Sequence, residues 1–228
     1  MSTFEIPDRA LPNEYENFPY FGENVQWPSY ELTPETTINS VVERISNLAE
    51  INPDEDLAGF LMQRALFKAA EAATNKNYGI GAVLWDLENS ELISEAGNQR
   101  RQKNDFDGFM PVAHAEIETI AKALTNLGKK KLFSRKIVLA TTLEPCMICT
   151  GGIINTHINK VLIGAPDEGG GHMLDSPENL ANDFHTIWKT HSIEWQIPDI
   201  NPELLQLSWE IFAVTKNQVA HKLHDKTD

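Results

Sequence analysis

The spacing of hydrophobic positions changes repeatedly along the chain between the period of a helix and that of a strand. Apolar residues recur every three or four positions in several segments, beginning with a short amphipathic helix between Pro34 and Pro53. Further helices are predicted at residues 56–75, 113–127, 145–155, 177–190 and 202–219. Short apolar runs bounded by turn residues predict strands at 79–85, 91–96, 137–141, 160–165 and 192–196.

This alternation of strands and helices is typical of an α/β fold. A turn around residues 88–90 joins the first two predicted strands. A predicted helix separates the fourth strand from the fifth, which favours a parallel crossover between them over a hairpin. The chain has 228 residues, of which 41% are hydrophobic, so it can bury one substantial core.

Charge and proline content divide the chain near residue 54. Residues 1–54 contain ten acidic residues, two basic residues and six of the twelve prolines, whereas residues 55–228 contain 23 acidic and 17 basic residues. The aromatic residues at 15–30 argue against a freely disordered tail, so we expect an irregular arm that packs on a surface or a partner. We therefore predict an acidic arm with a short helix at 1–54, a main domain at 55–197, and a C-terminal helix and tail at 198–228.

Charge and composition also restrict the partners and the location that we expect. A net charge of −14 argues against a large nucleic-acid surface, because such binding rests mainly on lysine and arginine side chains that displace counterions. The first residues lack the basic start and apolar run of a signal peptide, and no stretch reaches the roughly eighteen apolar residues of a membrane span. We therefore expect a cytoplasmic protein with no membrane partner.

The two cysteines of the chain, Cys146 and Cys149, form a Pro-Cys-x-x-Cys motif downstream of a His-x-Glu motif at His114 and Glu116. Three positions apart on a helix, the two thiolates share one face. Such a pair in a chain without a secretion signal indicates metal or redox use rather than a structural disulfide. With a histidine as third ligand, a tetrahedral zinc keeps its fourth position open for water, as catalytic sites do. Each motif alone is a weak signal, but together they match the known signature of zinc-dependent nucleobase deaminases.

At these motifs the chain resembles the cytidine and deoxycytidylate deaminase superfamily, in the branch of tRNA adenosine deaminases, guanine deaminases and fungal cytosine deaminase. The similarity extends from about residue 77 to residue 196. It includes Gly-Ala-Val-Leu at 81–84, Gly-Asn at 97–98, Ala-His-Ala-Glu-Ile at 113–117, Thr-Leu-Glu-Pro-Cys-Met-Ile-Cys at 142–149 and Val-Leu-Ile-Gly-Ala at 161–165. The resemblance implies a three-layer α/β/α sandwich with a five-stranded mixed sheet, a parallel fifth strand and, usually, a homodimer.

The resemblance also implies roles for individual residues. His114, Cys146 and Cys149 would bind one Zn²⁺ per chain, and Glu116 would move protons between water and substrate. Asn98 matches a position whose amide contacts the substrate in relatives, and the backbone N–H of Cys146 is a further candidate donor at the substrate site. Polar residues of the glycine-rich segment could line the pocket, although such residues are often solvated; they are His172, Asp175 and Glu178.

We expect a zinc-dependent hydrolytic deaminase that releases ammonia from a small nucleobase, nucleoside or nucleotide of guanine or cytosine type, with a small molecule favoured over nucleic acid. A tRNA adenosine deaminase is one alternative, supported by the glycines at 169–171 and the basic residues among 129–136. Arg100, Arg101 and Lys103 could bind a substrate phosphate or could simply be solvated. A second alternative is a catalytically idle zinc-stabilised module whose arm binds a protein, although the intact Glu116 argues against it.

Overall fold

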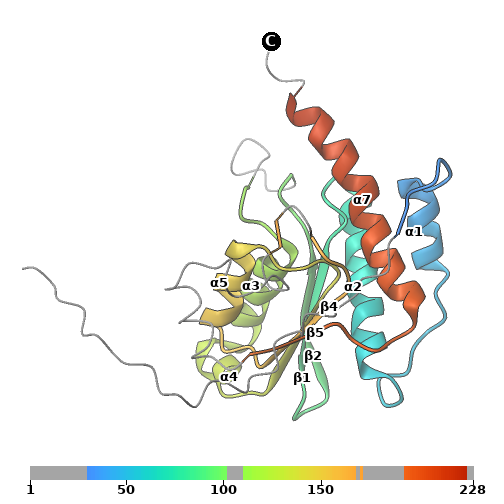
Figure 1. Ribbon diagram of the computed structural model, residues 1–228. Coiled ribbons are helices and arrows are strands. Elements are labelled where there is room, and N and C mark those ends of the chain that lie inside the picture. Colours follow the sequence, from blue (N-terminus) through green and yellow to red (C-terminus); the bar gives the residue numbers. More distant parts are fainter. Residues whose placement is uncertain (1–29, 102–109, 168–169, 172–192, 225–228) are drawn as a thin grey trace, which may run out of the picture.

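The computed structural model describes residues 30–101, 110–167, 170–171 and 193–224 (Figure 1). Most of the predicted acidic arm and the helix predicted at 177–190 lie outside the described residues. The same holds for three of the candidate pocket residues, His172, Asp175 and Glu178.

The described elements follow the predicted alternation of helices and strands. The helices are α1 (Ile38–Ser46), α2 (Leu57–Thr74), α3 (Ala115–Leu127), α4 (Lys129–Phe133), α5 (Met147–Asn155) and α7 (Pro202–His224). The strands are β1 (Gly81–Asp86), β2 (Glu91–Gly97), β3 (Ile137–Thr141), β4 (Lys160–Ile163) and β5 (Glu194–Gln196). Helix α4 was not predicted, because one turn with a single buried residue, Leu132, is too short to produce a helical period.

The five strands form one mixed sheet in the order β2-β1-β3-β4-β5. Strand β1 is antiparallel to both β2 and β3, whereas β3, β4 and β5 run parallel to one another. This arrangement confirms the predicted mixed sheet with a parallel fifth strand. The carboxyl ends of the parallel strands lie at one edge, which is where open α/β sheets place their sites.

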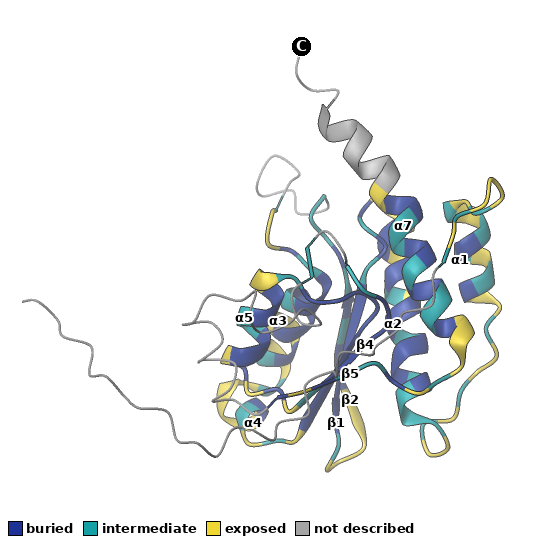
Figure 2. Cartoon of the chain, viewed as in Figure 1, coloured by how far each residue is buried: buried dark blue, intermediate teal, exposed yellow. Residues whose placement is uncertain are grey.

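Helices cover both faces of the sheet, so the predicted three-layer sandwich is confirmed (Figure 1). Alternate side chains of a strand point to opposite faces. Leu84 and Leu139 pack on the side of α3 and α5, whereas Val83 and Val138 pack against α2 on the other side. The strands are accordingly buried along most of their length, whereas exposed residues lie at the turns and outer helix faces (Figure 2).

Helices α1 and α7 pack on α2 and form an additional layer on that side of the sheet (Figure 1). Thr37 begins α1 with a capping box, in which Thr37 and Ser40 each bond the backbone N–H of the other. Arg44 of α1 pairs with the buried Glu210 of α7 at 2.5 Å. None of the described helices combines the length and the hydropathy needed to cross a bilayer.

Candidate metal centre and active site

Two helices begin at the same end of the sheet and bring the predicted ligands together. His114 is the N-cap residue of α3, and Cys146 is the N-cap residue of α5. Cys149 lies in the first turn of α5, on the buried side of that helix. The positive ends of helix dipoles stabilise thiolates, so this position favours the ionised cysteines that metal binding requires.

The three ligand atoms form a compact triangle. Nδ1 of His114 lies 3.5 Å from Sγ of Cys146 and 3.4 Å from Sγ of Cys149, and the two sulfur atoms are 3.6 Å apart. In the described part of the chain these three residues are the group that could hold a metal ion. The geometry therefore brings together the histidine and the two cysteines that the motifs suggested.

The size of this triangle fits a tetrahedral zinc ion. Bond lengths of about 2.3 Å to sulfur and about 2.05 Å to nitrogen, with tetrahedral angles, place two sulfur ligands about 3.8 Å apart. The same values place a nitrogen about 3.6 Å from each sulfur. The observed separations of 3.4–3.6 Å agree with these values to within about 0.2 Å, so little movement is needed to bind the ion.

Glu116 directs its carboxylate at the same group of atoms. It is the second residue of α3 and is only 3% exposed. Its Oε2 lies 3.2 Å from Sγ of Cys149. The predicted proton carrier thus lies beside the candidate metal centre, where a water or substrate atom would be within its reach.

The other carboxylate oxygen of Glu116 is held by a residue that the motifs did not indicate. The hydroxyl of Thr141 lies 3.0 Å from Oε1 of Glu116 and 3.1 Å from the carbonyl oxygen of Leu143. Thr141 is completely buried at the end of β3. In the sequence, Thr141 is visible only as a polar residue at the end of an apolar strand. Its contact with Glu116 depends on how α3 packs on the sheet and could not be predicted from that pattern.

The charges of the site act strongly on one another. The contact with the sulfur of Cys149, with help from His114, lowers the pKa of Cys146 to about 3. The same contact, together with burial, raises the pKa of Cys149, and the contact with Cys146 raises the pKa of His114. Because metal ligands must be deprotonated, a bound divalent cation would replace the protons that these groups share.

Burial has the largest effect on Glu116. It raises the pKa of the carboxyl group above its ordinary value, because a charge is costly in a site that excludes water. A carboxyl group with a raised pKa accepts a proton more readily than an ordinary one, which suits a proton carrier.

The loop after β2 carries Asn98 to the same end of the sheet. Asn98 is 2% exposed, and its Oδ1 accepts a hydrogen bond from the backbone N–H of Arg100 at 3.2 Å. The backbone N–H of Gln99 donates to the carbonyl oxygen of Ala113 at 2.9 Å, next to His114. The structure therefore holds the Asn98 loop beside the candidate metal centre, and the contact of its amide with a substrate stays a prediction.

The basic cluster at 129–136 lies at the opposite end of β3. Arg135 and Lys136 precede the start of this strand, whereas the metal centre follows its last residue, Thr141. Arg135 pairs with the buried Asp86 at 2.9 Å and also contacts Glu91. The cluster is thus separated from the metal centre by the length of a strand of five residues, which is roughly 17 Å.

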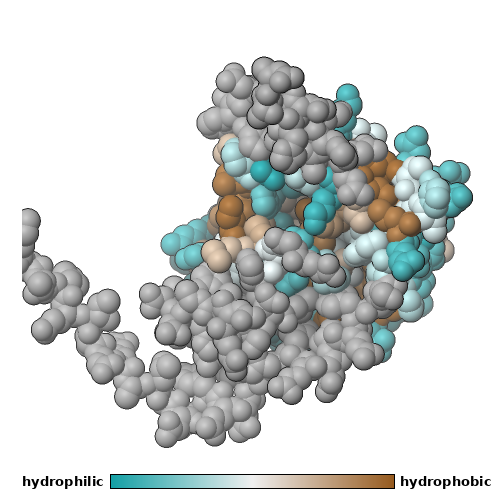
Figure 3. Space-filling model, turned by 45° about the horizontal axis from the view of Figure 1, so that its top comes forward, coloured by the Kyte–Doolittle hydropathy of each residue, from teal (hydrophilic) through white to brown (hydrophobic). Residues whose placement is uncertain are grey.

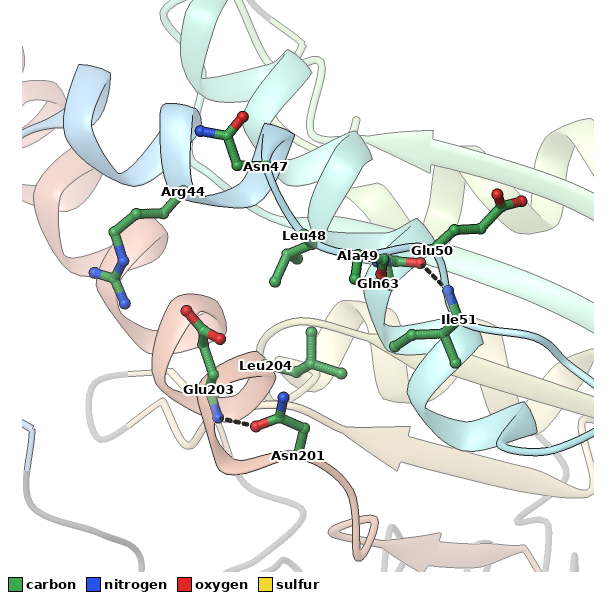
Figure 4. A pocket seen from close by; sticks show the side chains of 10 residues that line it. All are labelled: Arg44, Asn47, Leu48, Ala49, Glu50, Ile51, Gln63, Asn201, Glu203 and Leu204. Carbon is green, nitrogen blue, oxygen red and sulfur yellow. Dashed lines mark hydrogen bonds between the residues drawn. The ribbon is translucent and has the colours of Figure 1, made fainter.

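A pocket of about 370 Å³ lies between α1, α2 and α7, on the other side of the sheet from α3 and α5 (Figure 4). Leu48 and Leu204 form part of its wall, and the Gln63 amide at its edge bonds the backbone of Ala49 and Ile51. None of the predicted site residues that the structure describes lines it. This pocket is therefore separate from the candidate active site.

Large hydrophobic side chains are exposed next to the ligands. Val112, Met147 and Ile148 are 40%, 54% and 50% exposed, and each is within two residues of His114 or Cys146 in the sequence. The face turned forward in Figure 3 likewise shows separate hydrophobic patches between hydrophilic residues. The predicted homodimer could use such residues, but it stays a prediction.

Comparison with known proteins agrees with this geometry. The model of the cytidine and deoxycytidylate deaminase zinc-binding region matches residues 56–165. The tRNA-specific adenosine deaminase of Rickettsia bellii (strain RML369-C) is 35% identical over 109 residues, which are 47% of this chain and 70% of that protein. The chain belongs to the cytidine and deoxycytidylate deaminase family. The predicted family, enzyme class and zinc cofactor are confirmed at this level, and α1 and α7 lie outside the matched residues.

Two solved structures share the fold. One, from a study of A-to-I editing by tRNA:A34 deaminases at the wobble position of transfer RNA, is 30% identical with a TM-score of 0.52. That likeness covers 66% of this chain and 97% of the other. A guanine deaminase from Nitrosomonas europaea is 16% identical with a TM-score of 0.50, covering 80% and 94% of the two chains. At this identity the second likeness concerns the fold alone.

Proposed function

We propose that this protein is a zinc-dependent hydrolytic deaminase that releases ammonia from an amino-substituted nucleobase ring. The observation that carries the proposal is the position of Glu116, a buried carboxylate 3.2 Å from a sulfur of the ligand triangle. A structural zinc site needs no proton carrier at this position. The same geometry argues against a catalytically idle module.

The protein residues divide the reaction between binding the metal and moving protons. His114, Cys146 and Cys149 would hold the zinc, which supplies Lewis acidity that lowers the pKa of water toward about 7. Glu116 takes a proton from the attacking water and delivers it to the ring nitrogen. It then takes the second proton, from the hydroxyl group now on the ring carbon, and passes it to the leaving amino group, so that the oxygen of water replaces nitrogen on the ring carbon and ammonia departs. Thr141 keeps the Glu116 carboxylate in position through its hydroxyl.

An adenosine in transfer RNA is the substrate that the relatives favour. The Rickettsia protein is named a tRNA-specific adenosine deaminase, and the structure at 30% identity comes from work on editing of the wobble position. These names support our alternative better than the guanine- or cytosine-type substrate that we favoured from the sequence. Near the site, the guanidinium of Arg100 lies over the Tyr78 ring, 5.7 Å from its centroid, and offers a cation for a phosphate.

A small base, nucleoside or nucleotide is the second candidate. The observation in its favour is the net charge of −14, which opposes binding of a polyanion. In addition, the basic cluster at 129–136 lies at the far end of β3, and its Arg135 is engaged with Asp86 and Glu91. A transfer RNA that touches this cluster would have to span the length of the strand.

A direct assay of ammonia release separates these substrates. The zinc-loaded chain is incubated with an anticodon stem-loop that carries adenosine at the wobble position, and in parallel with adenine, adenosine, guanine, cytosine and dCMP. We expect ammonia and inosine from the stem-loop, with binding that weakens steeply as salt rises. Turnover of a free base or nucleotide without turnover of the stem-loop would replace the first candidate by the second. Absence of ammonia from every compound would contradict the proposed function.

Arg100→Ala offers a control for the role of phosphate. If a phosphate contact matters, this variant should weaken binding of the stem-loop or of dCMP and leave the KM for free guanine or cytosine unchanged. Equal effects on free bases and on phosphate-bearing substrates would show that Arg100 stabilises the loop after β2 and does not bind a phosphate.

A further inference from the structure

A second buried acid lies near the metal ligands, but its side chain faces the loop that follows β4. Glu144 is two residues before Cys146 and is 5% exposed. Its backbone N–H donates to the carbonyl oxygen of Ala165 at 2.8 Å. Its Oε2 accepts a hydrogen bond from the backbone N–H of Asp167 at 3.1 Å. One residue thus bonds the loop through both its backbone and its carboxylate.

Gly171 lies directly against this carboxylate. A Cβ atom added to Gly171 would be 2.3 Å from Oε2 and 2.4 Å from Cδ of Glu144, so the Glu144 carboxylate would have to move away from its present position. Gly171 also pairs with Cys146 as an antiparallel bridge. The lack of a side chain at Gly171 therefore lets the loop approach a metal ligand and the Glu144 carboxylate at once.

The described residues of the loop form a closed turn. The backbone N–H groups of Gly170 and Gly171 point at the carbonyl oxygen of Asp167, at 3.3 and 2.9 Å. Asp167 itself is bonded to Glu144. The carboxylate therefore holds the turn on one side, and the bridge to Cys146 holds it on the other.

We propose that Glu144 is a positioning residue that fixes residues 165–167 and 170–171, which follow β4, against Cys146, so that these residues form a wall of the substrate site at a constant position relative to the metal centre. The proposal rests on the proposed function for its effect on substrate binding. Its structural part, the coupling of Glu144 to Gly171, is independent of turnover.

The kinetic test uses two single variants, their combination and two controls. Glu144→Ala and Gly171→Ala should each raise the KM for the stem-loop, or for the small substrate that the ammonia assay selects, about tenfold. Bound zinc and kcat should change little. Glu144→Gln keeps an oxygen that accepts from Asp167 and should stay close to wild type. Gly151→Ala is the matched control, because an added Cβ there meets no atom within 4 Å.

The double variant provides the sharpest outcome. All three atoms that a Cβ at Gly171 would meet belong to the Glu144 side chain beyond its Cβ. Gly171→Ala should therefore add little to the KM of Glu144→Ala, so the two effects should not be additive. Additive effects, or an unchanged KM in Glu144→Ala, would overturn the proposal.

Amide hydrogen exchange tests the coupling without turnover. The peptide spanning residues 165–171 should exchange faster in Glu144→Ala and Gly171→Ala than in wild type, and Gly151→Ala should match wild type. Exchange at the wild-type rate in Glu144→Ala would overturn the role of Glu144 even in an active enzyme. A wild-type chain that releases no ammonia would instead overturn the proposed function, and the exchange rates would still decide the role of Glu144.

Discussion

Two buried carboxyl groups lie at opposite ends of the paired strands β1 and β3, and their pKa values are shifted in opposite directions. Asp86 lies where β1 meets the start of β3, and Glu116 lies beside Thr141 at the other end of β3. Burial raises the pKa of Glu116. Burial acts in the same direction on Asp86, but hydrogen bonds from Asn89 and Glu88 and the charge of Arg135 lower its pKa overall.

The number of donors explains this difference. Asp86 accepts hydrogen bonds from the backbone N–H groups of Glu88 and Asn89 at 2.8 and 3.1 Å, and from the Asn89 side chain at 2.7 Å. Its pairing with Arg135 at 2.9 Å adds a positive charge. Glu116, by contrast, contacts the Thr141 hydroxyl and the Cys149 sulfur. The partners of Asp86 therefore favour its ionised form, whereas burial favours the protonated form of Glu116.

The largest effect is expected from removing a metal ligand. Cys149→Ala deletes one of three ligand atoms, and a site with two protein ligands holds zinc poorly. We expect zinc content to fall well below about one per chain and ammonia release to become undetectable. Metal analysis by mass spectrometry, paired with the ammonia assay, checks this. Full zinc content in the variant would show that the ion binds elsewhere.

Replacing Asp86, at the opposite end of the strand pair, should lower the stability of the fold and leave catalysis unchanged. Asp86→Ala leaves several donors without an acceptor and should lower the free energy of unfolding by about 2 kcal/mol. Zinc content and KM should match wild type, because Asp86 lies at the far end of the strand pair. Urea unfolding followed by circular dichroism gives the stability. A selective loss of kcat would break the distinction between the two carboxylates.

The contact of Thr141 with Glu116 should have a moderate effect on catalysis. Thr141→Val keeps the shape of the side chain but removes the hydroxyl 3.0 Å from Oε1. We expect kcat to fall about tenfold while zinc remains bound. Thr141→Ser restores a hydroxyl and should recover most of the loss. Equal rates for the valine and serine variants would remove Thr141 from the account.

The smallest effect concerns pH. Because the folded pKa of Asp86 lies below its unfolded value, its contribution to stability is present above the unfolded pKa of about 3.9. The contribution is lost as pH falls through the folded pKa. Asp86→Asn keeps an acceptor oxygen without the charge, so its stability deficit should shrink at acid pH. Thermal melts of both proteins between about pH 3 and 7 measure this, and a deficit that grows below pH 4 would contradict it.

The candidate metal ligands could be predicted from the sequence because short motifs on helices determine which way their side chains point. Cys146 and Cys149 share one face at any helix N-terminus, and His114 with Glu116 starts the neighbouring helix. The mixed sheet could likewise be predicted from strand spacing and the crossover rule.

Residues whose roles depend on packing could not be found in this way. Thr141 reaches Glu116 across 25 positions, and Glu144 contacts Gly171 across a loop that returns from β4. Neither pair has a local pattern, since strand pairing and helix placement bring its members together. The basic residues at 129–136 show the opposite case, because they gather in the sequence yet lie at the end of β3 remote from the metal centre.

The central claim is that Glu116 moves protons at a zinc centre built from His114, Cys146 and Cys149. The most direct test measures zinc content and ammonia release together in wild type and in Glu116→Gln, which keeps the size of the side chain. The account predicts about one zinc per chain in both proteins and a rate lower by about 10²–10⁴-fold in the variant. Turnover at the wild-type rate in zinc-loaded Glu116→Gln would contradict it.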